Sequence, residues 1–482
     1  MELQNPCQWI PLKHAKSRED LPAYQSRFLP LSVLLMQSGV DGIEMSMGDD
    51  LGAWDNLGTE VPGLARGAVF ENADQTAYEV LFAPLDSPRA GNIIKKGKYR
   101  FTYRLSLPYV RKNILPLEIA SGFLIQQDFE TRWPSLEHLK GLKKNNMGML
   151  RIHNDGDCYD NGIFWRDSDY PPYPEDEMIK MDNALADAQK VGIPVVPYFS
   201  VKEYHPETAG FQEDAESCAR QVIPGEKFLE NFFGTSLFGM QMCLCSKWYD
   251  TRKKTIEMPL DNHAFSGMYY DWCMGLECIN PAHNHGKRHW DNDQLLRLIE
   301  WSRQRAGDQG KLYLHLTNVP SLALENMANM VLTEESVYSE IFPEMFTPHV
   351  HFLNIAPRSI CIMIPNADSK QLRALTLAAL LHHATLCTEY PVVLDFYKSN
   401  EKLLNSLSKY NRHSAPGEGI TYTGSRKVGM SLYWKNKKAL ALLANLSDQE
   451  QTGDWSINLN GKTICGTATV PPLDLLPIEI DL

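Results

Sequence analysis

The residues of this sequence best suited to chemistry are carboxylates that follow short apolar segments. Asp271 ends the segment Gly267-Met-Tyr-Tyr-Asp. Its carboxylate would therefore lie at the end of an apolar strand, among aromatic side chains. Aromatic rings stack on the C–H faces of sugars, and apolar surroundings raise the pKa of a carboxyl group until it can donate a proton. Glu334 and Glu335 follow Val331-Leu-Thr in the same way. We interpret Asp271 as a nucleophile or electrostatic stabiliser and Glu335, or Glu334, as the acid/base.

Both sets of carboxylates have a structural alternative. Asp271 would then cap the loop that follows it, and the glutamates would be stabilised by the dipole at the start of the next helix. Other polar and aromatic side chains lie at or near the ends of similar apolar segments, where a barrel enzyme binds its substrate. Those that we expect to contact the substrate are His153, Asp155, Trp165, Tyr198, Glu203, Tyr270, Trp272, His315 and Asp395.

Cysteine and histidine residues gather directly after Asp271, in the pattern Cys273-x4-Cys278-x4-His283-x-His285. Two thiolates and two imidazoles can form a tetrahedral zinc site. We predict a structural zinc ion that clips this loop, and Cys243 or Cys245 could join or replace a ligand. In the alternative interpretation the imidazoles satisfy backbone groups and the reduced thiols pack as small hydrophobic side chains. The predicted chemistry requires no other cofactor.

An α/β fold of the (β/α)8 barrel type would bring these residues together. Short apolar runs alternate with helical patterns, and eight such units suffice for a barrel. A doubly wound open sheet is less suitable, because no Gly-x-Gly-x-x-Gly follows an early strand. The helices are expected near 175–191, 292–305 and 370–384. The strands are expected at 122–127, 148–153, 194–199, 267–271, 312–317, 329–333, 359–364 and 392–396.

Strand-like segments flank the predicted barrel on both sides. Before it, the runs 42–47, 77–82 and 98–108 alternate between apolar and polar residues, as in an antiparallel β-sandwich. After it, 419–422, 429–434 and 439–445 are short strands separated by polar turns. We therefore predict a β-sandwich domain over 1–117, the catalytic barrel over 118–408 and a small C-terminal β domain over 409–482.

Composition excludes several classes of protein. The 482 residues are 43% hydrophobic and 22% charged, which is typical of an ordered globular chain, and ten cysteines are too few for a disulfide scaffold. The formal net charge of −12 argues against nucleic-acid binding. No apolar run reaches the roughly 20 residues of a membrane span. The run 28–36 is too short for a signal peptide, so we expect a periplasmic or secreted protein if the chain is a processed form, and a cytoplasmic one otherwise. The oligomeric state stays open.

Three groups of residues together resemble bacterial proteins of the glycoside hydrolase family 123-like type. The first is Gly42-Ile-Glu-Met with Asp49-Asp and Trp54, followed by Tyr99-Arg-Phe-Thr-Tyr-Arg-Leu; the second is Tyr270-Asp271-Trp-Cys with Cys278-Ile-Asn-Pro-Ala-His283; the third is Leu314-His315-Leu-Thr-Asn with Thr333-Glu334-Glu335. The resemblance covers nearly the whole chain and implies a β-sandwich, a (β/α)8 barrel and a small C-terminal β domain. It also implies hydrolysis of a glycosidic bond. In that family an Asp-Glu pair supports attack by the acetamido group of the substrate, whereas this chain carries Asp271-Trp272.

The sequence therefore predicts a glycosidase that degrades a complex glycan by carboxylate acid/base chemistry at the C-terminal face of the barrel. The separation of the two carboxyl groups would decide the outcome, with about 5 Å giving retention and about 6.5–9.5 Å giving inversion. Two alternatives remain at this point. One is a carbohydrate-binding barrel without catalysis, and the other is a metal-dependent hydrolase.

Overall fold

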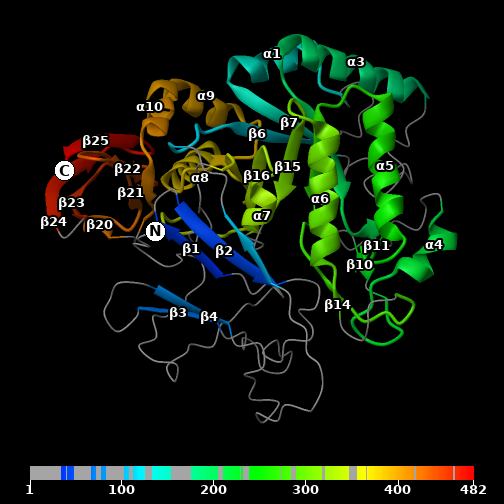
Figure 1. The fold of residues 1–482 in the computed structure, drawn as a ribbon. Coiled ribbons are helices and arrows are strands. Elements are labelled where there is room, and N and C mark those ends of the chain that lie inside the picture. The colour runs from blue at the N-terminus through cyan, green and yellow to red at the C-terminus, as the bar shows by residue number, and fades with distance from the viewer. Residues whose placement is uncertain are drawn as a thin grey trace.

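A parallel sheet of eight strands forms the centre of the molecule (Figure 1). The structure is a computed structural model that describes residues 34–38, 41–47, 67–71, 78–82, 103–107, 112–124, 133–153, 175–204, 210–227, 229–231, 238–271, 273–283, 289–316, 321–346, 355–364, 366–416, 419–459 and 462–482. The central strands, in spatial order, are β6 (Ile119–Leu124), β7 (Met147–His153), β8 (Val195–Ser200), β12 (Gly267–Asp271), β15 (Lys311–His315), β16 (Met330–Val337), β17 (Arg358–Met363) and β18 (Thr385–Leu386).

The last strand returns to the first and nearly closes the sheet into a barrel. The Thr385 hydroxyl of β18 donates a hydrogen bond of 2.8 Å to the carbonyl oxygen of Glu118, the residue before β6. Close backbone approach also occurs within the barrel at Gly267, which has a φ of +148°. A Cβ atom there would lie 1.9 Å from the carbonyl oxygen of Lys311, so only glycine fits where β12 begins beside β15. The predicted (β/α)8 barrel is confirmed.

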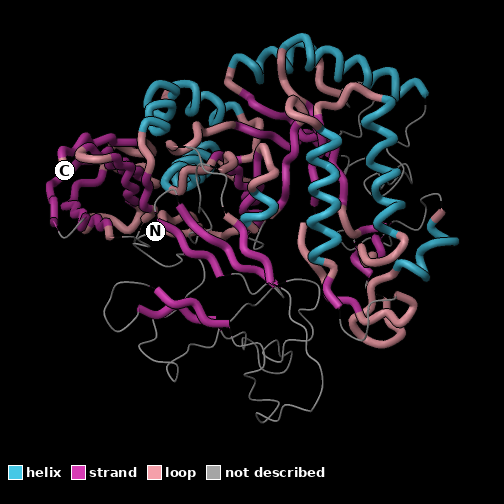
Figure 2. Tube along the Cα trace, in the orientation of Figure 1, coloured by secondary structure: helices cyan, strands magenta, loops and turns pink. Residues whose placement is uncertain are grey.

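Helices surround the barrel strands on the outside (Figure 2). The predicted helices near 175–191, 292–305 and 370–384 are present, and the last of them is preceded by a capping box formed by Asp368 and Gln371. None of the helices in the described part of the chain combines the length and the apolar composition that a membrane crossing requires. The helices are α1 (Leu136–Lys144), α3 (Glu175–Val191), α4 (Phe211–Cys218), α5 (Trp248–Asn262), α6 (Asn292–Ala306), α7 (Leu322–Glu325), α8 (Ser369–Leu381), α9 (Pro391–Ser399) and α10 (Glu401–Ser406), with a 3-10 turn at Leu407–Lys409.

The prediction of an eighth barrel strand at 392–396 is wrong. This segment lies in α9, where Val393, Leu394, Phe396 and Tyr397 form a buried face and Pro391 occupies the first turn. Apolar residues at these spacings suit one face of a helix, and the β-branched valines made the run look like a strand. The eighth strand is instead the two-residue β18. Asp395 is therefore exposed on an outer helix and does not end a barrel strand, which contradicts its predicted contact with substrate.

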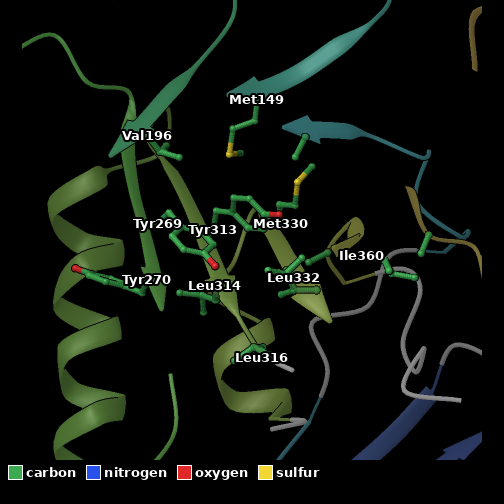
Figure 3. Packing of buried hydrophobic residues seen from close by; sticks show 14 of the residues in the cluster. Met149, Val196, Tyr269, Tyr270, Tyr313, Leu314, Leu316, Met330, Leu332 and Ile360 are labelled. Carbon is green, nitrogen blue, oxygen red and sulfur yellow. The ribbon is translucent and has the colours of Figure 1, made fainter. Parts of the chain in front are cut away.

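Alternation along the strands determines which side chains fill the barrel. Tyr269 and Tyr313 point into the interior near Met149 and Met330, whereas Tyr270 points toward a neighbouring helix (Figure 3). The Tyr270 hydroxyl lies 2.8 Å from the hydroxyl of Ser302 on α6, and the side chain is fully buried. The expectation that Tyr270 contacts substrate is therefore wrong, because the residue faces away from the barrel interior.

Antiparallel β structure flanks the barrel on both sides in sequence. The described N-terminal residues form a sheet of β1 (Leu34–Ser38), β2 (Asp41–Met47) and β5 (Tyr103–Ser106), and a pair of β3 (Gly67–Glu71) and β4 (Tyr78–Phe82). Arg104 of β5 forms an ion pair with Asp293 in the first turn of α6. Since α6 starts where the loop after β12 ends, this sheet reaches the C-terminal face of the barrel. A sandwich arrangement over 1–117 and the exact domain boundaries stay predictions.

The C-terminal region forms two antiparallel sheets around a separate apolar core, as the expected small β domain requires. Trp455 and Ile457 from one sheet and Leu432 and Leu443 from the other belong to that core. The first sheet contains β19 (Arg412–Ser414), β21 (Val428–Lys435), β22 (Lys438–Asn445) and β25 (Leu475–Asp481); the second contains β20 (Ile420–Tyr422), β23 (Gln451–Leu459) and β24 (Lys462–Val470).

A buried ion pair joins α7 to the start of β17. Arg358 Nη2 lies 2.6 Å from Glu325 Oε2, and both side chains are almost completely buried. Burial raises the pKa of Glu325 even though the Arg358 charge opposes that shift. Each charge therefore depends on the other for its stability inside the protein.

Replacing only Arg358, as Arg358→Leu, is expected to lower the free energy of unfolding by about 3–5 kcal/mol, because it leaves Glu325 buried without its partner. The double variant Arg358→Leu/Glu325→Leu should recover much of this loss, since both charges are then removed. Urea unfolding of the three proteins measures the difference. A double variant as unstable as the single one would contradict this account of the pair.

Candidate active site

Polar side chains occupy the C-terminal end of the barrel interior. Met149, Val196, Tyr269 and Tyr313 form an inner layer (Figure 3), and each is followed two residues later by a polar side chain. Because strand side chains repeat their direction every second residue, those polar side chains lie in the next layer toward the C-terminal face. They are Arg151, Tyr198, Asp271 and His315.

Glu335 joins this layer because β16 contains a β-bulge. The pairing of β16 with β17 shifts by one residue between Leu332 and Glu334, so that Glu335 pairs with Cys361. Without the extra residue, alternation from the inward Met330 would have directed Glu334 into the barrel. Instead Glu335 reaches the site, and Glu334 is largely buried next to it in the strand.

The imidazole of His315 lies between two carboxylates. Its Nδ1 atom is 2.8 Å from Asp271 Oδ1, and its Nε2 atom is 3.3 Å from Glu335 Oε2. The Tyr198 hydroxyl donates a hydrogen bond of 2.6 Å to the other Asp271 oxygen, Oδ2. His315 is 11% exposed, Asp271 23% and Glu335 35%. The cluster therefore opens toward solvent on the side of Glu335.

The charges around His315 favour its protonated form. Burial alone would lower the pKa of His315, but the nearby carboxylates of Asp271 and Glu335 outweigh burial and raise that pKa above its ordinary value. An imidazolium between two carboxylates compensates part of their negative charge in a poorly solvated space.

Arg151 supplies a second positive charge to the same layer. Its guanidinium carbon lies 4.3 Å from the centre of the Tyr269 ring, which is a cation–π contact. The side chain is largely buried, and in the described part of the chain its Nε atom has no hydrogen-bond partner. A guanidinium group held in this way can donate hydrogen bonds to the hydroxyl or acidic groups of a ligand.

Loops beside Asp271 are tied together by the buried carboxylate of Asp291. It accepts hydrogen bonds from the backbone N–H groups of Leu244 at 2.9 Å and Leu276 at 2.8 Å. It also pairs with the buried Lys202, which follows β8. One carboxylate thus connects the loops after β8, β11 (Phe238–Gln241) and β12, all of which lie near the C-terminal face.

The other residues predicted to contact the substrate differ in where they lie. His153 is the last residue of β7, where the sequence placed it, whereas Glu203 is fully buried in β9 (Glu203–Tyr204). Arg151 was not predicted, although a single arginine in the apolar run Met147-Gly-Met-Leu-Arg-Ile is the kind of signal that could have identified it. Outside the described residues lie Asp155, Trp165, Trp272 and His285.

The predicted metal ligands are only partly brought together. Cys278 and His283 lie in one cluster with Cys243, and this is the group of possible ligand residues that the described part of the chain contains. Cys273 was predicted as a ligand but is not in the cluster; its Sγ atom lies 3.4 Å from the carbonyl oxygen of Tyr270. The prediction for Cys273 is therefore wrong, because the end of β12 holds its side chain against that strand.

Comparisons with known proteins support the barrel architecture. Residues 158–314 match the family described as "Domain of unknown function (DUF6259)", a segment that contains Asp271 and ends one residue before His315. A comparison with curated proteins finds no match. Two structures of the GH36 alpha-galactosidase AgaA from Geobacillus stearothermophilus are similar to this chain. The variant in complex with stachyose has a TM-score of 0.51 at 11% identity, covering 96% of this chain and 70% of that one.

The second structure, a variant in complex with 1-deoxygalactonojirimycin, has a TM-score of 0.52 at 9% identity and covers 97% of this chain and 70% of the other. Likeness at this level of identity concerns the fold. The protein is thus a (β/α)8 barrel with flanking β domains, in an arrangement that is also found in a glycoside hydrolase. The description of the matched family does not name glycoside hydrolase family 123, so the resemblance to the latter stays a prediction.

The raised pKa of His315 predicts a pH-dependent contribution to stability. A group whose pKa is raised by folding stabilises the folded state below its unfolded pKa, and this stabilisation is lost as the pH rises through the folded pKa. The difference in free energy of unfolding between the parent and His315→Gln is therefore expected to be largest below about pH 6.5. It should shrink as the pH rises through the raised pKa of His315 in the folded protein. Urea unfolding across this range is the measurement, and a difference that grows with pH would contradict the assignment of an imidazolium.

Proposed function

We propose that this protein is a glycosidase in which Asp271 is the nucleophile or electrostatic stabiliser and Glu335 is the acid/base. The observation that carries the proposal is the contact of both carboxylates with His315. An imidazole ring spans only about 2 Å between its nitrogens, so the nearest carboxylate oxygens are at most about 8 Å apart. Such a separation suits a pair of carboxylates that act on the two sides of one glycosidic bond, by retention or by inversion.

The environments of the two carboxylates support different roles. Asp271 is held through both oxygens, by the Tyr198 hydroxyl and by the His315 imidazole. A carboxylate fixed in one orientation is suited to attack the anomeric carbon or to stabilise its developing positive charge. Glu335 is more exposed, and its carboxylate contacts the His315 imidazole and the Cys361 thiol. It is better able to exchange a proton with the leaving oxygen and then with water.

His315 and Arg151 are the positioning and binding groups in this proposal. His315 contacts both carboxylates and so relates their positions to each other. Arg151, held against Tyr269, would donate hydrogen bonds to the polar groups of a bound sugar. Neither of these two residues is assigned a covalent step.

The substrate proposed for this site is a sugar of a complex glycan in glycosidic linkage. The similarity to an alpha-galactosidase suggests α-galactosides as a first class to test. The resemblance to family 123 suggests β-N-acetylhexosaminides, although Trp272 rather than glutamate follows Asp271. A panel of aryl α-galactosides, α-glucosides and β-N-acetylhexosaminides, together with natural glycans, therefore covers the proposed substrates.

On a glycan that the parent cleaves, Asp271→Asn and Glu335→Gln are each expected to lower kcat by at least about 100-fold, because each removes one half of the carboxylate pair. The melting temperatures should change little, since the amides keep the size and some hydrogen bonds of the acids. Product release measured by chromatography provides the rates.

Two substitutions serve as matched controls. Glu334→Gln changes the neighbouring carboxylate that the bulge directs away from His315, and Asp395→Asn changes an exposed carboxylate on α9. Both should retain activity near that of the parent. Full activity of Asp271→Asn, or a loss in Glu334→Gln equal to that in Glu335→Gln, would contradict the assignment. Glycan binding by calorimetry without any product from the parent would favour a binding protein instead.

A further inference from the structure

A second cluster of reactive side chains lies in the loops after β11 and β12. Cys243 follows β11, Cys278 ends β13 (Glu277–Cys278), and His283 lies five residues further along the chain. All three side chains are buried, with 1%, 1% and 5% exposure. None of them takes part in the carboxylate chemistry proposed above. We propose that Cys243, Cys278 and His283 bind a structural zinc ion, with Cys245 as the fourth ligand.

The distances within the cluster suit one tetrahedral ion. One ligand atom from each of the three residues lies within 4.8 Å of the others. Cys278 Sγ and His283 Nδ1 are 3.4 Å apart. With Zn–S bonds of about 2.3 Å and Zn–N bonds of about 2.0 Å, tetrahedral ligand atoms lie roughly 3.5–3.8 Å from one another. Small side-chain movements would therefore bring these three atoms into coordination.

The hydrogen bonds of His283 select the nitrogen that a metal requires. Its Nε2 atom lies 2.8 Å from the carbonyl oxygen of Ser217. A carbonyl oxygen can only accept, so Nε2 carries the hydrogen and donates it. The lone pair of the neutral ring is then on Nδ1, which faces Cys278. Metal-binding histidines commonly donate their second ring N–H to a backbone carbonyl in this way.

A backbone donor beside Cys278 also suits a thiolate ligand. The backbone N–H of Asn280 points to Cys278 Sγ at 3.5 Å, and a donor of this kind stabilises a negative sulfur. The Cys243 thiol interacts with the thiols of both Cys278 and Cys245. Cys245 is partly exposed, and its sulfur lies 3.1 Å from His289 Nε2. Because Cys245 already contacts the Cys243 thiol, it is the proposed fourth ligand.

An ion at this position would join parts of the chain that are distant in sequence. Cys243 and Cys245 precede α5, whereas Cys278 and His283 belong to the loop that begins just after Asp271. Asp291 already links the same two loops through Leu244 and Leu276. The zinc ion would add a second link between these two loops beside the C-terminal face of the barrel. It would not contact the substrate.

Elemental analysis of the full chain, purified without chelators, tests the proposal. We expect about one zinc ion per chain in the parent and less than about a tenth of that in Cys278→Ser and His283→Ala. Cys273→Ser is a matched control, because Cys273 is buried in the same loop but lies outside the cluster. Cys465→Ser, an exposed cysteine of the C-terminal domain, is a second control. Both controls should keep the full zinc content.

Cobalt substitution keeps the proposal testable if the ligand variants fail to fold. Replacing the metal of the parent by Co²⁺ should produce the charge-transfer absorption of cobalt thiolates, and Cys245→Ser should weaken it in proportion to the loss of one sulfur. A parent without zinc that also gives no cobalt–thiolate absorption would overturn the proposal. So would zinc that is lost in Cys273→Ser but kept in Cys278→Ser, or a parent in which Cys243 and Cys278 form a disulfide. None of these outcomes depends on glycosidase activity.

Discussion

The imidazole of His315 between the carboxylates of Asp271 and Glu335 is the interaction on which the proposed site depends. Two carboxylates that share a poorly solvated space repel each other, and each gains from a cation placed between them. His315 takes this position because β15 lies between β12 and β16 in the sheet, with its side chain directed inward. The order of the three strands thus sets the arrangement: β15 carries the imidazolium, and its two neighbours β12 and β16 carry the carboxylates.

The apolar layer beneath this cluster holds in position the strands that carry its side chains. Tyr269 and Tyr313 pack with their ring centres 4.9 Å apart, two residues before Asp271 and His315 respectively. Arg151 covers the Tyr269 ring from β7, so the same aromatic side chain supports both a carboxylate and a cation of the layer above. At the rim, Asp291 and the Cys243–Cys278–His283 cluster connect the loops that follow the strands. Rigid strands position the chemistry, and long-range polar contacts organise the loops around it.

Most of the barrel could be predicted because each strand is a short apolar run bounded by turn residues. In each long helix, the apolar residues recur with the period of an α-helix. The eighth unit was the exception. Its strand, Thr385–Leu386, is too short to produce a pattern, and the valines of α9 imitate one. Tyr270 and Asp395 were misplaced for related reasons: the direction of a strand side chain depends on the phase of the strand, and Asp395 was assigned to a strand that does not exist.

By itself the sequence determined the fold class, the carboxylate Asp271 at the end of its strand, the pair Glu334-Glu335, and a cysteine–histidine cluster next to them, since residue type and local periodicity specify these features. Only the tertiary structure decided which members of these sets lie together. A single bulge turned Glu335 rather than Glu334 toward His315. Contacts between loops about 35 residues apart placed Cys243 rather than Cys273 beside Cys278. Local patterns specify elements, whereas the convergence of side chains from different elements depends on how those elements pack.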